Sequence, residues 1–118
     1  MMKRTHIALL LATLSLGGCY YDVEEELYPG SFCDVANVTW SGTIKPIVDL
    51  TCATPGCHVA GGTGPGNFTT YAGVKAKVDD GSFRSQVLVS QAMPPTGPLG
   101  SCSLQQIDIW LNAGAPEN

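Results

Sequence analysis

Glycine and proline are unusually frequent in this chain, and they limit what it can fold into. Residues 19–118 hold 12 of the 14 glycines and all 8 prolines, which is about one residue in five. Such a segment forms long irregular loops and keeps few aliphatic side chains for a core. Small domains with so little core commonly depend on a disulfide, a metal or a cofactor. The composition therefore predicts a single loop-rich domain that needs such an addition at its centre.

The first 18 residues have the layout of a secretory signal. Two basic residues precede an apolar run over 7–16 that is too short to span a bilayer as a helix. The Leu-Gly-Gly-Cys sequence that ends at Cys19 resembles the bacterial lipobox, in which the cysteine thiol receives a diacylglycerol. We expect cleavage before Cys19 and a lipid anchor on its thiol. The alternative is an ordinary signal peptide, with Cys19 left as a spare thiol.

Charge and sorting signals point to the cell envelope. Acidic residues outnumber basic ones by ten to four over 19–118, and nucleic acid is excluded as a partner because phosphate binding needs a basic patch. The acidic run 22–26 predicts a tether over 19–32, which would connect a lipid anchor in the membrane to the domain. Tyr20 stands where lipoproteins retained at the inner membrane have an aspartate. By that resemblance we expect the outer membrane, facing the periplasm or the cell surface.

Three helices are predicted from apolar spacing and capping residues in the middle of the chain. The first covers 41–51, where Pro46 is tolerated only near the first turn because it lacks an N–H. Thr70 is placed to cap a short second helix. A third runs over 82–89, with Ser82 as its cap. Glycine- and proline-rich loops separate these segments.

The last helix has the clearest signals. Ser103 and Gln106 have the spacing of a capping box, and Gly114 suits the left-handed residue after the helix. An apolar stripe follows helical spacing and consists of Leu104, Ile107, Trp110 and Leu111. Packing between helices is the expected role of Trp40 and Trp110. No segment alternates like a strand, so the predicted class is all-α with much loop.

The spacing of the cysteines is the most specific functional signal. Export to an oxidising compartment could pair the four cysteines after Cys19 in two disulfides. However, Cys52 and Cys57 are separated by four residues, and His58 follows directly. A c-type haem is held by thioether bonds from two nearby cysteines, with the next histidine as axial iron ligand. The usual gap is two residues, and the longer gap also occurs among c-type cytochromes. The pattern predicts haem attachment at this position.

A second iron ligand can be named from the sequence. After the leader, Met93 is the only methionine and His58 is the only histidine. Met93 stands before Pro94-Pro95 in a loop rather than on an apolar helical face. A thioether fixed by prolines suits the sixth position of the iron, and histidine–methionine ligation raises the reduction potential. We therefore expect His58 and Met93 as axial ligands.

With these motifs in this order, the chain resembles small lipid-anchored class I cytochrome c domains of bacteria. The resemblance covers about residues 33–118 and includes Thr-Tyr-Ala-Gly-Val, Met-Pro-Pro and a terminal Asn-Ala-Gly-Ala-Pro. It implies a class I cytochrome c-like fold of three to five short helices around one covalent haem c, with the first and last helices crossing. By the same resemblance the haem is held by Cys52, Cys57, His58 and Met93.

The resemblance also gives roles to two further features. In class I cytochromes a Gly-Pro such as Gly64-Pro65 turns the backbone so that a carbonyl accepts the ligand imidazole N–H, which implies that Pro65 orients His58. Once haem takes the middle cysteines, Cys33 and Cys102 are left as a disulfide pair. This bridge would pin the starts of the first and last helices, and closing about 70 residues contributes roughly 4 kcal/mol.

Two readings without haem are kept open. A local disulfide between Cys52 and Cys57 would make the protein a disulfide-stapled envelope lipoprotein with a structural or binding role. Zinc bound by the four cysteines is the other reading, although their spacings suit it poorly.

The function expected from the haem reading is single-electron transfer. With both axial positions filled by the protein, the iron has no open site for a substrate, so we expect a carrier and not an enzyme. Redox proteins would be its partners, docking through a small and weak interface. A peroxidase-like enzyme is the alternative if Met93 can leave the iron.

Overall fold

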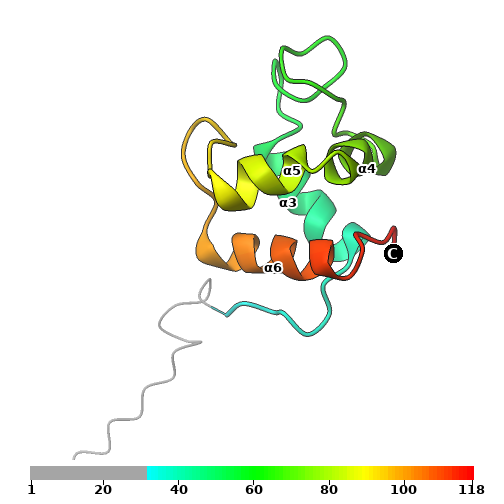
Figure 1. Cartoon of the computed structure of the whole chain (residues 1–118), viewed down its shortest axis with the longest axis vertical. Helices are drawn as coiled ribbons and strands as arrows, with labels where there is room; N and C mark the ends of the chain where they lie inside the picture. Colours follow the sequence, from blue (N-terminus) through cyan, green and yellow to red (C-terminus); the bar gives the residue numbers. More distant parts are fainter. Residues whose placement is uncertain (1–31) are drawn as a thin grey trace, which may run out of the picture. The chain divides into compact units, whose positions relative to one another are not determined.

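The described part of the chain consists of short helices joined by long loops. The computed structural model describes residues 32–118, of which Cys33–Asn118 form one compact unit. In chain order the elements are η1 (Trp40–Ile44), α3 (Lys45–Thr51), α4 (Tyr71–Asp79), α5 (Ser82–Arg84), η2 (Ser85–Val89) and α6 (Ser101–Asn112) (Figure 1). Residues 32–118 contain no strand, so the all-α, loop-rich class is confirmed for them.

The first helix begins at Trp40, with Thr39 as its cap. The Thr39 hydroxyl accepts the N–H of Gly42 at 3.0 Å. Pro46 is the second residue of α3 and lies in its first turn, as the sequence predicted. The preceding turn is a wide π-type turn, in which the Ile44 N–H reaches the Thr39 carbonyl at 3.0 Å. Widening of the turn makes room for a residue that lacks an N–H and would otherwise press on the preceding carbonyl.

One face of this helix packs into the core, and the last side chain on that face is a cysteine. Trp40, Ile44, Val48 and Cys52 follow at intervals of four residues and are 5, 0, 0 and 8 % exposed. Residues four apart lie on the same side of a helix, so the stripe is continuous. Because Cys52 is the last member of the stripe, the helical register fixes the burial of its side chain.

Helix α6 packs on the start of the first helix through two tryptophans. The rings of Trp40 and Trp110 are stacked with centroids 5.6 Å apart, which confirms their expected role between helices. The indole N–H of Trp110 donates to the Pro116 carbonyl at 3.0 Å, and the Tyr71 hydroxyl donates to the Ala115 carbonyl at 2.8 Å. These bonds hold the segment after α6 against the core.

The predicted start of α6 is wrong, whereas its apolar stripe is confirmed. The helix begins at Ser101, two residues before the expected cap Ser103, and no side chain caps it. Gln106 does not reach back to the helix start, because its amide donates to the Asp34 carbonyl at 2.8 Å. Ile107 and Trp110 are buried, with Leu104 and Leu111 packed beside them. Gly114 has the expected left-handed conformation, with φ of 90°.

Of the two caps predicted for the middle helices, one is confirmed. The Thr70 hydroxyl accepts the N–H of Gly73 at 3.2 Å, as expected for a cap. Ser82 is instead the first residue of α5, and Gly81 is the cap with φ of 80°. The serine side chain is engaged by Asp80, so it is not free to cap the helix. Phe83 is buried in the core, as the helical spacing predicted.

A disulfide joins the segment before the first helix to the start of α6. Cys33 and Cys102 are bonded with their Cα atoms 5.4 Å apart, which confirms the predicted pair. None of the helices within 32–118 is long and apolar enough to cross a membrane. The predicted signal peptide, the lipidation site Cys19 and the tether up to residue 31 lie outside the described residues.

The disulfide should contribute most of its stability by restricting the unfolded chain. Replacing both Cys33 and Cys102 with Ser should lower the free energy of unfolding by roughly 4 kcal/mol, less any strain in the bridge, as measured by urea denaturation. Dithiothreitol should destabilise the wild type to a similar extent and leave the double variant unchanged. A wild-type midpoint that does not respond to reductant would contradict the bond.

Candidate functional site

A cavity of about 460 Å³ lies between the loop after α3, the α5–η2 helix and the loop at Met93. Its walls include Cys52, Cys57, His58, Pro65 and Met93, which are all the residues of the predicted haem site. Met93 follows His58 by 35 residues in the chain, so the fold brings together groups that are distant in sequence. The volume falls in the range of roughly 300–1,000 Å³ that is typical of cofactor and ligand pockets.

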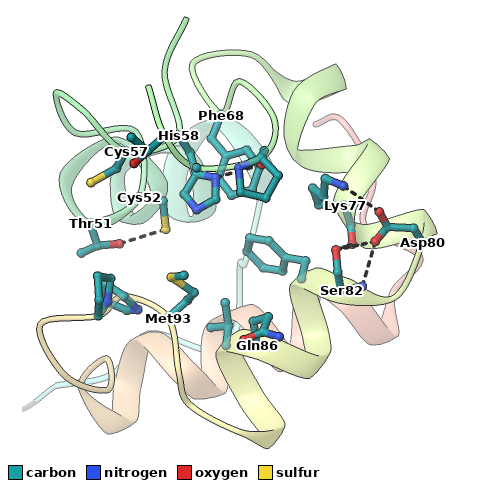
Figure 2. A pocket seen from close by; sticks show the side chains of 17 residues that line it. Thr51, Cys52, Cys57, His58, Phe68, Lys77, Asp80, Ser82, Gln86 and Met93 are labelled. Atoms are coloured by element: carbon teal, nitrogen blue, oxygen red, sulfur yellow. Dashed lines mark hydrogen bonds and ion pairs between the residues drawn. The ribbon is translucent and has the colours of Figure 1, made fainter. Parts of the chain in front are cut away.

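The imidazole of His58 is oriented by a backbone carbonyl. Its Nδ1 lies 3.0 Å from the carbonyl oxygen of Pro65, the contact expected from the Gly-Pro sequence. A carbonyl only accepts hydrogen bonds, so Nδ1 carries the proton in the neutral ring. Nε2 then keeps a free electron pair, and Figure 2 shows the ring reaching into the cavity. This is the tautomer that a metal-binding histidine needs.

Backbone hydrogen bonds fold the glycine-rich loop over the Cys57-His58 segment. The Gly64 N–H donates to the Cys57 carbonyl at 3.2 Å, and the Phe68 N–H donates to the His58 carbonyl at 2.8 Å. Gly62 packs so closely that a Cβ on it would lie 2.0 Å from the Cys57 carbonyl oxygen. A larger residue would therefore push the loop away from the site. The glycines that weaken regular structure here permit close contact of two backbone segments.

The two cysteines are not bonded to each other and differ in their surroundings. Cys52 is buried at the end of the first helix, and Cys57 is half-buried in the loop. Burial raises the pKa of the Cys52 thiol, and the neighbouring Cys57 adds to the rise, while a hydrogen bond with Thr51 opposes it. The raised pKa favours the neutral thiol. Cys52 therefore lies against the cavity as an apolar side chain.

Met93 faces the histidine from the other side of the cavity. Figure 2 shows its thioether and the His58 ring on opposite sides, with the Cys52 sulfur toward one end. The Met93 N–H donates to the Gln86 carbonyl at 3.2 Å, which ties the loop to η2. Pro94 and Pro95 also line the cavity and stiffen the chain after the methionine. A nitrogen and a sulfur donor thus face each other across the cavity.

The end of the cavity opposite the cysteines is polar. Asp80 accepts hydrogen bonds from the Ser82 hydroxyl, from the Ser82 N–H at 2.8 Å and from Lys77 Nζ at 3.0 Å. These contacts, chiefly those from Ser82, lower the pKa of Asp80 to about 2. Lys77 lines the same end. The cavity thus has a sulfur-containing end and an end with charged and hydrogen-bonding groups (Figure 2).

Sequence reasoning did not identify Phe68 or the polar end as parts of this site. The ring of Phe68 is stacked on that of His58 with centroids 4.2 Å apart and planes 7° apart. A lone aromatic residue after a glycine-rich loop carries no signal for such a contact. Lys77, Asp80 and Ser82 belong to a helix end and a turn, where polar residues are expected without any functional reason.

The described residues do not support the two interpretations without haem. Within 32–118 no group of three or more histidine, cysteine, aspartate or glutamate side chains is arranged to hold a metal ion. The four-cysteine zinc site is wrong, because Cys33 and Cys102 are bonded to each other. Cys52 and Cys57 have free thiols, so the second disulfide of the stapled-lipoprotein reading is not formed.

Comparisons with known proteins place the chain in no family. No protein-family model, no curated protein and no solved structure matches it. Function is therefore argued from the site alone.

Proposed function

We propose that this protein is a lipid-anchored monohaem c-type cytochrome that transfers single electrons in the cell envelope. The observation that carries the proposal is the cavity. It gathers two unbonded thiols, an imidazole in the metal-binding tautomer and an opposed thioether. These donors match one covalent haem c held by Cys52 and Cys57, with His58 and Met93 as axial ligands and the Pro65 carbonyl orienting His58.

The character of the cavity walls fits the two edges of a porphyrin. The vinyl groups that react with cysteine lie on the edge opposite the two carboxylates. The cavity has its thiols at one end, and at the other it has Lys77 and the Ser82 hydroxyl. The apolar rings of Phe68 and Phe83 also line the cavity and would exclude water. The residues present therefore fit an amphipathic macrocycle of this kind.

Electron transfer is the chemistry that such a group supplies when bound. The chain's own contribution is to fix the two axial donors and to keep water away from them. If His58 and Met93 both bind the iron, no open position for a substrate would be left, which favours a carrier over an enzyme. Transient redox protein partners would dock through a small interface, and acidic residues on the domain favour basic patches on them.

The anchor places the carrier at a membrane. With Cys19 lipidated and residues 19–32 as an acidic tether, we propose the outer membrane, facing the periplasm or the surface. A stretch of about a dozen residues reaches up to roughly 40 Å when extended, so the domain could serve neighbours on the same membrane. Fractionation of the native cells should recover the protein with outer membranes. Recovery with inner membranes would contradict this location.

Haem content is the direct test of the proposed function. The full chain, matured with the cytochrome c assembly machinery, should show a Soret band and a sharp α-band after reduction. The haem should stay with the chain in acidified organic solvent, because thioether bonds resist extraction. Replacing both Cys52 and Cys57 with Ser should abolish this retention. A featureless spectrum of folded protein would reject haem and favour an envelope lipoprotein that the Cys33–Cys102 bond alone stabilises.

Replacing Met93 with Ala should open the sixth coordination position. We expect the ferrous form to bind carbon monoxide and the reduction potential to fall, because a thioether ligand favours the reduced iron. Leu99→Ala is the matched control, since Leu99 lies in the same loop and packs on the core without lining the cavity. A spectrum and potential unchanged in Met93→Ala would assign the sixth ligand elsewhere.

A further inference from the structure

The imidazole of His58 is held on three sides by groups of the glycine-rich loop. The Phe68 ring covers one face, nearly parallel to it and with centroids 4.2 Å apart. Gly64 lies against the ring as well, because a Cβ on Gly64 would come within 2.8 Å of Nδ1, 2.9 Å of Cε1 and 3.0 Å of Cγ. The Pro65 carbonyl holds the Nδ1 edge. Little free rotation is left to the ring.

We propose that Phe68 and Gly64 are positioning residues that fix the plane of the His58 ring and thereby tune the iron it ligates. The inference rests on the proposed function. The hydrogen bond to Pro65 holds the ring at one atom, Nδ1. Contacts on the ring faces resist tilting of the ring about that atom, as a parallel aromatic neighbour favours one plane. Phe68 and Gly64 thus reinforce the orientation that the hydrogen bond sets.

Phe68 can act as a rigid support because it is itself held in place. Its side chain is 5 % exposed, and its N–H donates to the His58 carbonyl at 2.8 Å. Phe83 supports it from the core with ring centroids 6.1 Å apart. Phe68 is therefore hydrogen-bonded to the His58 backbone and packed into the core. The Phe68 ring cannot move unless the loop backbone or the core packing also moves.

The plane of an axial imidazole affects the iron through orbital overlap. The ring donates π density perpendicular to its plane, so its rotation decides which of two iron d orbitals is raised in energy. This splitting determines the g-values of the ferric ion in electron paramagnetic resonance, and it contributes to the reduction potential. A positioning role is therefore visible in a spectrum that general loss of stability does not shift.

Phe68→Leu tests the stacking contact in the haem-loaded full chain. We expect shifted or broadened ferric g-values and a shifted reduction potential. Ile107→Val is the control, because Ile107 is buried in the core but does not line the cavity. It should lower thermal stability and keep the g-values. Phe68→Tyr should restore both signals, since it keeps the aromatic face. Wild-type g-values in Phe68→Leu would overturn the role of Phe68.

Gly64→Ala tests the contact of Gly64 with the ring. The added methyl would meet the imidazole at less than normal contact distance, so the ring must turn and the g-values should shift. Gly100→Ala is the control, because a Cβ there meets nothing within 4 Å. Equal g-values in Gly64→Ala and wild type would overturn the role of Gly64.

Failure of the haem proposal can be separated from failure of the ring-positioning proposal. If the wild type carries no haem, the same variants can be compared by proton magnetic resonance of the folded, disulfide-bonded chain. The stacked Phe68 ring should shift the His58 ring protons upfield, and Phe68→Leu should abolish this shift while Ile107→Val keeps it. Haem present with unchanged g-values rejects positioning alone, and His58 protons that are unshifted in a haem-free wild type reject the ring contact as well.

Discussion

Four side chains on one face of the first helix hold the core together, and the last of them places a thiol at the cavity wall. Trp40 stacks on Trp110 of α6, Ile44 and Val48 are fully buried, and Cys52 ends the stripe at the cavity wall. Because the residues are four apart, they share one orientation along the helix. A change in register would withdraw the tryptophan from α6 and the thiol from the cavity together. Core packing and the position of the thiol are thus one constraint.

The cavity exists because loops, rather than helices, form much of its wall. Loops offer few apolar side chains, and here they are held by backbone hydrogen bonds and by close glycine contacts such as that of Gly62 with Cys57. A wall of this kind keeps its shape without filling the space that it encloses. About one residue in five is glycine or proline, so the chain has few apolar side chains for a core. In the proposed cytochrome, the haem macrocycle would supply the apolar contacts that the loops lack.

Local sequence rules failed where a distant group took over a side chain. Ser103 and Gln106 have the spacing of a capping box, but Gln106 donates to Asp34, beside the disulfide that holds α6 to the N-terminal segment. Ser82 does not cap α5, because Asp80 engages its hydroxyl. The apolar stripes were predictable because several residues on one helix face are buried together, and no single contact decides the pattern. Capping depends on one hydrogen bond, which a neighbour can redirect.

The sequence by itself determined the all-α class and the helix faces, whereas the Cys33–Cys102 pair followed only once haem was assigned to the middle cysteines. It also named the five residues of the candidate site, because the cysteine–histidine spacing and the unique Met93 are visible without a structure. Only the tertiary structure decided that Met93 faces His58, that Phe68 stacks on the imidazole and that the far end of the cavity is polar. The spacing of residues along the chain predicts only which side chains are neighbours within one turn or helix. Contacts between residues 10 or 35 positions apart depend on how the intervening loops and helices fold, and no periodicity in the sequence encodes them.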